Sequence, residues 1–150
     1  MKRSSLMFAE VGAAIIANYK ISSKEEALIH IADNPGHFIY MPEKLMSVDM
    51  CLVIANKRPD LFVFVPHEFK TYEVCKEAVK TGSYNFELVP TEIKSYDFCL
   101  MAVKHDCFSF PLVPLKHKTV ELCLIAVREN SNLMMFVPKN LQNKIKLMLK

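Results

Sequence analysis

Five prolines at a constant spacing of 24 residues constrain the fold of this chain more than any other feature. Hydroxyl, acidic, small apolar and large apolar residues recur in the same register, so the chain is an array of short units. The prolines are Pro42, Pro66, Pro90, Pro114 and Pro138. The other columns are Ser23, Ser47, Thr71, Ser95 and Thr119; Glu25, Asp49, Glu73, Asp97 and Glu121; Ala27, Cys51, Cys75, Cys99 and Cys123; and Phe38, Phe62, Phe86, Phe110 and Met134.

Each unit predicts a helix, a turn and a second short element. The hydroxyl residue suits a helix N-cap, and the acid two positions later suits the positive end of the helix dipole. In the second unit the helix is expected to end near residue 57, before a turn at Arg58 and Pro59. The segment that follows, Phe-x-Φ-Val-Pro (62–66, with Φ a large apolar residue), fits either a helical turn or an extended piece, and the sequence leaves both open.

One such unit cannot bury its apolar side alone, so the units are expected to stack. We predict an all-α fold, a short α-solenoid of five helix–turn–helix repeats that form a single domain over 1–150. A helix over 5–19 is expected to cap the array, with Leu6, Ala9, Ala13 and Ile16 on one side, and a basic closing helix is expected at the end. The predicted segments are 1–22 (cap), 23–46, 47–70, 71–94, 95–118 and 119–142 (repeats) and 143–150 (tail).

The segment 65–82 reads VPHEFKTYEVCKEAVKTG. It resembles the tandem helical repeats catalogued as domain of unknown function 4116, which have a pattern close to VPxELKTxExCxxAVKxxG. The resemblance spans about 23–142; it is best in the third unit and weaker in the first, where Ala27 replaces cysteine. The fourth unit departs from the pattern after Pro114, where Leu115 and Lys116 follow. The resemblance implies a helical stack of recognition or scaffold character, as in accessory proteins of bacteria or large viruses, and no activity, cofactor or functional residue.

The composition is that of an ordinary soluble protein, with 51% apolar and 23% charged residues and a net charge of +3. An odd number of cysteines, five, favours reduced thiols in a cytoplasm, either of the producing cell or of a host. Glu10 interrupts the apolar stretch that follows the basic N-terminus, so no cleaved signal is expected. No apolar run reaches the roughly 20 residues that cross a bilayer, and we expect no membrane partner.

Catalytic and metal chemistry find little support in the sequence. The in-register cysteines lie on successive layers of a stack, so they cannot converge on one metal ion and are expected to be core residues. Cys107 lies outside the register, in a turn beside Lys104, His105 and Asp106. Cationic neighbours lower a thiol pKa, so Cys107 is a possible reactive thiol, with an ordinary turn residue as the alternative. The histidines lack a metal-binding spacing and are expected to be isolated, and we predict no catalytic residue, cofactor or metal.

The variable positions of the units are therefore the candidates for binding. Two basic columns are expected to form stripes, either as a solvated surface or as a binding face: Lys80, Lys104 and Arg128, and Lys70, Lys94 and Lys118. The residues after the prolines show no structural preference: Glu43, His67, Thr91, Leu115 and Lys139. The same holds at the turns for Lys57, Thr81, His105 and Glu129. We predict a non-enzymatic binding module or scaffold for a protein partner, an accessory, effector or inhibitor protein. The alternative is an inhibitor that associates with nucleic acid, or mimics it, through charged stripes.

Overall fold

The computed structural model describes residues 2–150, and side chains from residue 6 onward. Over this range the structure is all-helical and contains no strand, which confirms the predicted all-α class. The chain divides into two compact units, Met1–Thr81 and Gly82–Lys150, which are described separately. No helix in the described part of the chain is long and apolar enough to cross a membrane.

The two units contain α-helices that alternate with 3₁₀ helices (η). The first unit contains α1 (Lys2–Tyr19), α2 (Lys24–Asp33), η1 (Pro35–Tyr40), η2 (Glu43–Leu45), α3 (Val48–Lys57), η3 (Pro59–Phe64), η4 (His67–Phe69) and α4 (Tyr72–Thr81). The second unit contains η5 (Ser83–Leu88), α5 (Tyr96–His105), η6 (Cys107–Leu112), η7 (Leu115–His117), α6 (Val120–Glu129), η8 (Ser131–Phe136) and α7 (Lys139–Met148).

The hydroxyl column forms helix N-caps, as predicted. The Ser47 and Ser95 side chains accept hydrogen bonds from backbone N–H groups three residues ahead, at 3.2 and 3.3 Å. Ser23 adds a capping box, in which the Glu26 carboxylate accepts from the backbone N–H of Ser23. These bonds satisfy amides that have no partner within the helix, so each of the helices α2 to α6 begins directly after the predicted residue.

The Phe-x-Φ-Val-Pro segments fold as helical turns and end in an extended residue. Phe62 lies in the 3₁₀ helix η3, and Val65 is extended with φ −69° and ψ 121°, as expected for a residue that precedes proline. Since a 3₁₀ helix has three residues per turn, Phe62 and Val65 point the same way, and both are buried. The phenylalanine column is core, as predicted: Phe38, Phe62, Phe86 and Phe110 are fully buried.

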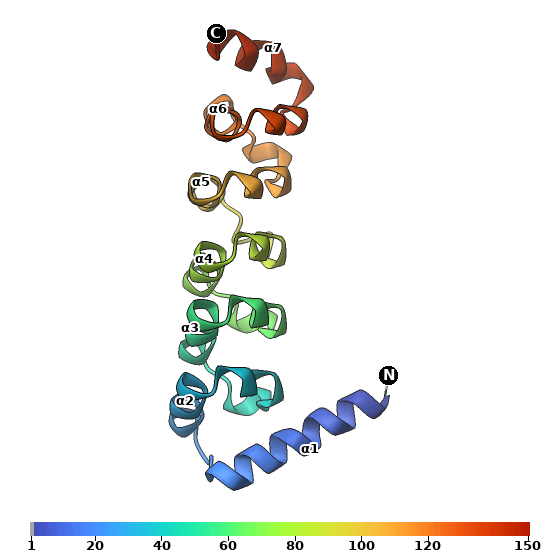
Figure 1. Cartoon of the computed structure of the whole chain (residues 1–150), viewed down its shortest axis with the longest axis vertical. Coiled ribbons are helices and arrows are strands. Elements are labelled where there is room, and N and C mark those ends of the chain that lie inside the picture. The colour runs from blue at the N-terminus through green and yellow to red at the C-terminus, as the bar shows by residue number, and fades with distance from the viewer. Residues whose placement is uncertain (1) are drawn as a thin grey trace. The chain divides into compact units, whose positions relative to one another are not determined.

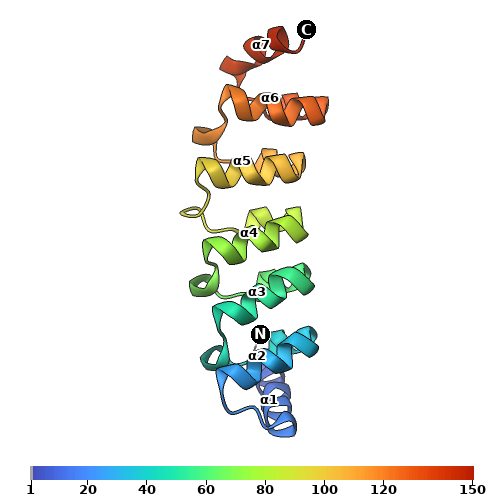
Figure 2. The same cartoon turned by 90° about the vertical axis from the view of Figure 1, so that its left-hand side faces the viewer.

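In the first unit α2, α3 and α4 form one layer and the 3₁₀ helices another, and in the second unit α5 and α6 do the same, whereas α1 and α7 lie across the ends of their units (Figures 1 and 2). In the first unit α2 packs on α3, α3 packs on α4, and η1 packs on η3. In the second unit α5 packs on α6, α6 packs on α7, and η6 lies between η5 and η8. The buried apolar residues lie between the two layers and between neighbouring helices.

The terminal helices differ from the predicted ones. Helix α1 packs on η1 through Gly12 and Ile15, whereas Leu6, Ala9 and Ala13 of the predicted apolar side are exposed. The Gly12 position explains the difference, because a Cβ there would collide with the carbonyl oxygen of Tyr40, and only glycine allows this close approach.

At the other end, α7 begins directly after Pro138, whereas the sequence placed the closing helix over 143–150. It therefore takes the place of the short 3₁₀ turn that follows Pro42, Pro66 and Pro114. Ile145 is fully buried against the rest of the second unit, and this contact anchors a helix that the sequence pattern placed too late.

Candidate protein-binding surface

The residues that follow the repeat prolines are all exposed, in both units. In the second unit they include a large apolar side chain, Leu115, which is 73% exposed at the start of η7. Lys139, the equivalent residue one period later, opens α7. The sequence thus identified positions that reach solvent, although exposure alone does not define a site.

Three further apolar side chains are exposed near Leu115. Leu112 ends η6, Phe136 ends η8, and Met135 beside it is 75% exposed. A groove of about 230 Å³ continues from Leu115 along Pro138 and Leu141. We call these side chains together the C-terminal apolar surface: Leu112, Leu115, Met135, Phe136, Pro138 and Leu141.

Lys118 holds the two 3₁₀ helices of this surface in place. Its Nζ donates to the carbonyl oxygens of Pro111 in η6 and Phe136 in η8, both at 3.3 Å. It also lies 4.8 Å from the centre of the Phe110 ring, in a cation–π contact. Burial lowers the pKa of the Lys118 ammonium, and the nearby Cys123 thiol opposes this effect. Leu112 follows Pro111 in the chain, and Phe136 itself accepts one of the two hydrogen bonds. The contacts of Lys118 therefore bring Leu112 and Phe136 to the same end of the 3₁₀ layer.

The segments that build this surface carry only basic charge. There is no aspartate or glutamate in 111–118 or in 130–150. Lys116 and Lys139 are exposed on either side of Leu115 and Pro138, and α7 adds Lys144 and Lys146. The C-terminal apolar surface is therefore surrounded by positive potential, which attracts an acidic ligand.

The sequence analysis did not single out Leu112, Met135 and Phe136, because it left open whether this segment is a helical turn or an extended piece. In a 3₁₀ helix the two residues between the buried Phe and Val positions face outward, as Val63 and Phe64 do in the first unit. The spacing of three between Phe and Val was the signal that separates the buried from the exposed positions.

One predicted basic column is structural rather than a solvated stripe or a binding face. Besides Lys118, Lys70 lies 4.9 Å from the Phe62 ring centre and Lys94 lies 4.9 Å from that of Phe86. Lys94 Nζ also donates to the Glu87 carbonyl at 3.4 Å, and burial lowers the pKa of Lys70. These ammonium groups are half-buried over the core rings, so they offer little charge to a ligand.

The other basic column stays at the surface. Lys80 forms an ion pair with Glu77 at 2.9 Å, whereas Lys104 and Arg128 in the second unit are exposed. All three side chains are exposed, so the whole column remains accessible to a partner. The ion pair of Lys80 does not change this, because an ion pair at the surface contributes little to stability.

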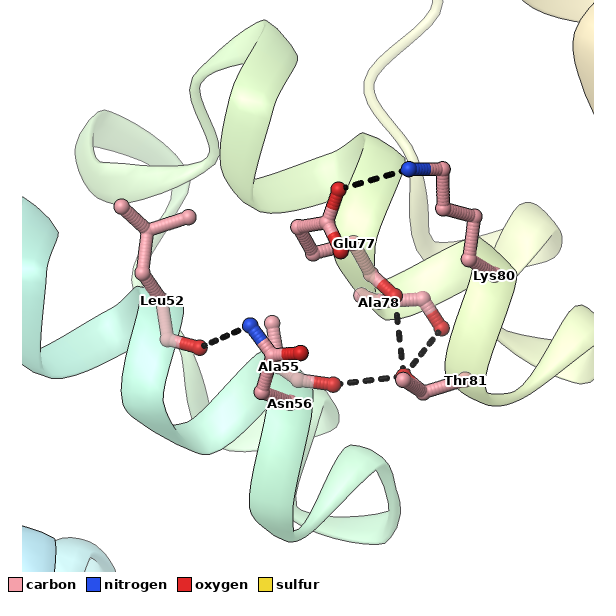
Figure 3. Close-up of polar contacts among 7 residues, drawn as sticks. All are labelled: Leu52, Ala55, Asn56, Glu77, Ala78, Lys80 and Thr81. Carbon is pink, nitrogen blue, oxygen red and sulfur yellow. Dashed lines mark hydrogen bonds and ion pairs between the residues drawn. The ribbon is translucent and has the colours of Figure 1, made fainter.

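Two of the predicted contact residues at the turns make internal hydrogen bonds instead. Thr81 Oγ1 donates to the Ala55 carbonyl oxygen of the neighbouring helix α3 (Figure 3). Lys57 Nζ donates to the Ala32 carbonyl oxygen at the end of α2, at 2.6 Å. These side chains satisfy helix-end carbonyls that have no partner within their own helix, which corrects the view that the positions are structurally free.

The histidines are not all isolated, which corrects a second expectation. His30 Nε2 and His37 Nδ1 are 2.9 Å apart and share a hydrogen bond between α2 and η1. His30 is buried, with 8% of its surface exposed. The turn at Pro35 and Gly36 brings α2 and η1 together.

The thiols behave as core groups. Cys51, Cys75, Cys99 and Cys123 are free and buried, as predicted. Burial raises the pKa of Cys51 to about 12 and that of Cys99 to about 11. Cys107 is half-buried, and burial, followed by the charges of Asp106 and Glu129, raises its pKa as well. Burial and these two acidic charges oppose the activation of Cys107 that its cationic neighbours suggested in the sequence.

No group of three or more metal-ligating side chains comes together within residues 6–150. The family model for a domain of unknown function (DUF4116) matches residues 95–142. This segment coincides with the fourth and fifth sequence units, so this part of the chain is similar to that family. No curated protein and no solved structure gives a significant match to the chain.

Proposed function

We propose that the chain is a short α-solenoid of five 24-residue repeats that binds a protein partner without catalysing a reaction. The recurrence of an α-helix followed by 3₁₀ turns supports this architecture. The match to DUF4116 begins and ends at predicted unit boundaries, 95 and 142, which also supports a repeat of this length. The solenoid supplies a rigid backbone, and its variable side chains supply the contact surface.

The observation that carries the proposal is the exposure of large apolar side chains beside a groove in the second unit. Leu115 and Met135 are about three-quarters exposed although buried positions lie within two residues of each of them. A group of large apolar side chains that packing within the unit leaves exposed is typical of an interaction site. The proposed contact residues are those of the C-terminal apolar surface together with Lys116 and Lys139.

The partner that fits this surface is an apolar segment flanked by acidic residues. Leu115 and Leu141 offer apolar contact along the groove, and the lysines around it favour carboxylates. The other predicted contact residues, His67, Thr91, Lys80, Lys104 and Arg128, lie outside this patch and stay candidates for contacts of their own. We expect the complex to form in a cytoplasm, where the thiols stay reduced.

The nucleic-acid alternative rests on the same lysines. It is weakened by the half-buried positions of Lys70, Lys94 and Lys118, since a phosphate contact needs an accessible ammonium group. Leu115 and Met135 provide no stacking surface for bases, which single-stranded recognition requires. Binding that declines steeply with ionic strength and is lost on nuclease treatment would favour this alternative.

The proposal is tested by affinity capture from nuclease-treated lysate of the producing cells with the wild type and two variants. Met135→Glu places a carboxylate on the C-terminal apolar surface. Val63→Glu places one at the equivalent position of the first unit, where the side chain is 54% exposed. We expect one acidic-segment protein to be retained by the wild type and by Val63→Glu, and to be lost from Met135→Glu. Equal retention by all three proteins would overturn the assignment of the surface.

A further inference from the structure

The bonded histidines and α1 form a cluster in the first unit that the binding surface does not use. His30 lies on α2, His37 lies on η1, and their rings are stacked with centroids 5.1 Å apart. Tyr19, the last residue of α1, places its ring 4.2 Å from that of His30 and 6.2 Å from that of His37. Three elements therefore meet at one hydrogen bond between two titratable rings.

This hydrogen bond depends on the number of protons that the two rings carry. One ring nitrogen must donate an N–H and the other must accept with a bare lone pair. The bond survives when the pair carries one extra proton, because the second ring is still neutral. When both rings are protonated there is no acceptor, and two positive charges face each other at 2.9 Å between the nitrogens.

The charged groups around the pair do not remove this repulsion. Asp33, Glu26 and Lys20 line the same pocket of about 420 Å³ beside His30. Glu26 already accepts from Ser22 and Ser23, so Asp33 is the carboxylate left to offset a charge on His30.

The elements packed on α2 and η1 bring further cations. Lys57 Nζ of α3 bonds to the Ala32 carbonyl close to Asp33, and Arg58 reaches Gly36 of η1 while it pairs with Asp60 at 2.7 Å. The neighbourhood is thus close to neutral overall and offers no surplus of negative charge to a doubly protonated pair.

The electrostatics agree in sign with this geometry. Burial, followed by the charge of His37, lowers the pKa of His30, and Asp33 opposes this only in part. As pH falls, the unfolded chain therefore takes up this proton first, near the ordinary histidine pKa of about 6.5. The stability that neutral His30 contributes is complete above that pH and is lost as pH falls from there toward the lowered pKa of the folded state.

Helix α1 depends on the elements that the pair joins. It packs on η1, where the Phe8 and Tyr40 rings lie 5.4 Å apart and Gly12 touches the Tyr40 carbonyl. Its last residue, Tyr19, packs on both histidines. A shift of η1 relative to α2 would therefore disturb the packing of Tyr19, whose ring lies against a ring on each of these two elements.

We propose that the His30–His37 pair is a proton-sensitive latch. It holds α1 on the first unit while at least one of the two rings is neutral, and it releases α1 when both rings are protonated. Release would open the apolar groove of about 440 Å³ that α1 forms with η1, lined by Phe8, Ile16 and Ile39 among others, and would expose its η1 side. The latch acts independently of the C-terminal apolar surface, so either proposal can fail alone.

The test is amide hydrogen exchange of the α1 peptides in the full chain between pH 7.5 and 5, corrected for the intrinsic pH dependence and measured with a metal chelator. The wild type is expected to exchange about tenfold faster or more in α1 at the acidic end. His37→Asn keeps a polar side chain but removes one titrating ring, so its corrected rate should be independent of pH. His67→Asn, which removes another histidine of the same unit, should behave as the wild type does.

A pH-independent wild type, or the same acidic acceleration in His37→Asn, would overturn the latch. If His37→Asn does not fold, NMR titration of the wild-type imidazoles gives the second readout. We expect the second protonation of the pair to coincide with the loss of α1 protection, and two independent titrations with α1 still protected would contradict the proposal. A repeat with zinc in place of the chelator distinguishes protonation of the pair from loss of a bound metal ion. Acid release of α1 that persists unchanged without metal supports protonation as the cause.

Discussion

The two compact units share one 24-residue pattern but use its variable positions in different ways. In the first unit these positions make internal contacts: Lys57 bonds to Ala32, Thr81 bonds to Ala55, and a hydrogen bond between Glu43 and Glu68 raises the pKa of Glu43. In the second unit Leu115, which lies at such a variable position, belongs to an apolar surface with a basic border. Divergence between repeats is therefore not by itself a sign of binding.

The difference lies in what each side chain can reach. Lys57 and Thr81 are long or polar enough to bond to a free carbonyl at the end of the neighbouring helix, and they lie where that carbonyl is open. Leu115 has no polar atom beyond its backbone, so its exposure has no internal explanation. An exposed apolar side chain in a variable column is a stronger indication of a partner than an exposed charge.

The shared framework should respond equally in the two units. Phe62→Ala and Phe110→Ala each remove a fully buried ring, and both should lower the free energy of unfolding by about 3–5 kcal/mol. The measurement is chemical denaturation of each variant beside the wild type, monitored by circular dichroism.

A decrease in the free energy of unfolding of less than about 1 kcal/mol in either variant would contradict this expectation, because cavity formation at a packed site costs more than that. Such a result would mean that one unit relaxes around the missing ring and that the common pattern hides two different cores. Tyr84→Ala in the second unit, at an exposed ring, is the control and should stay within about 0.5 kcal/mol of the wild type.

The lysine columns give the next largest effect. Lys118→Met keeps the apolar stem but removes the charge over Phe110 and both carbonyl contacts, so we expect a loss of about 1–2 kcal/mol. Lys139→Met, at the exposed start of α7, should change stability by less than about 0.5 kcal/mol, while it weakens capture of an acidic partner. The check is denaturation of both variants together with the capture experiment; equal stability of both would show that the cation–π contact contributes nothing.

Much of the framework could be predicted from the sequence because its causes are local. N-caps depend on one side chain and an amide three residues ahead, and the proline restricts the residue before it, so Ser47 and Val65 were placed correctly. The ends were harder, since the packed side of α1 depends on a glycine that meets Tyr40 across space.

The candidate sites depended on contacts between distant residues. Leu115 was named because its column shows no structural preference, but Met135 was missed because its exposure follows from 3₁₀ rather than α-helical winding. The His30–His37 bond was missed because the histidines lack a metal-binding spacing and were expected to be isolated. The cation–π role of Lys118 joins residues eight apart, and no local propensity reports such a contact.

The smallest effect distinguishes the two units at a single register position. Thr81→Val removes the hydroxyl that donates to the Ala55 carbonyl but keeps a β-branched side chain, so we expect a loss of about 1 kcal/mol. Glu129→Ala, at the equivalent position of the second unit, should change the free energy of unfolding by less than about 0.5 kcal/mol. Denaturation curves measured in parallel give the difference between the two variants.

A loss at Glu129 as large as that at Thr81 would place a structural contact in the second unit too, and its variable positions would then be as occupied as those of the first. A loss at neither position would mean that water satisfies the Ala55 carbonyl as well as Thr81 does, because the helix end is partly solvated, and the turn column would again be free for a partner in both units.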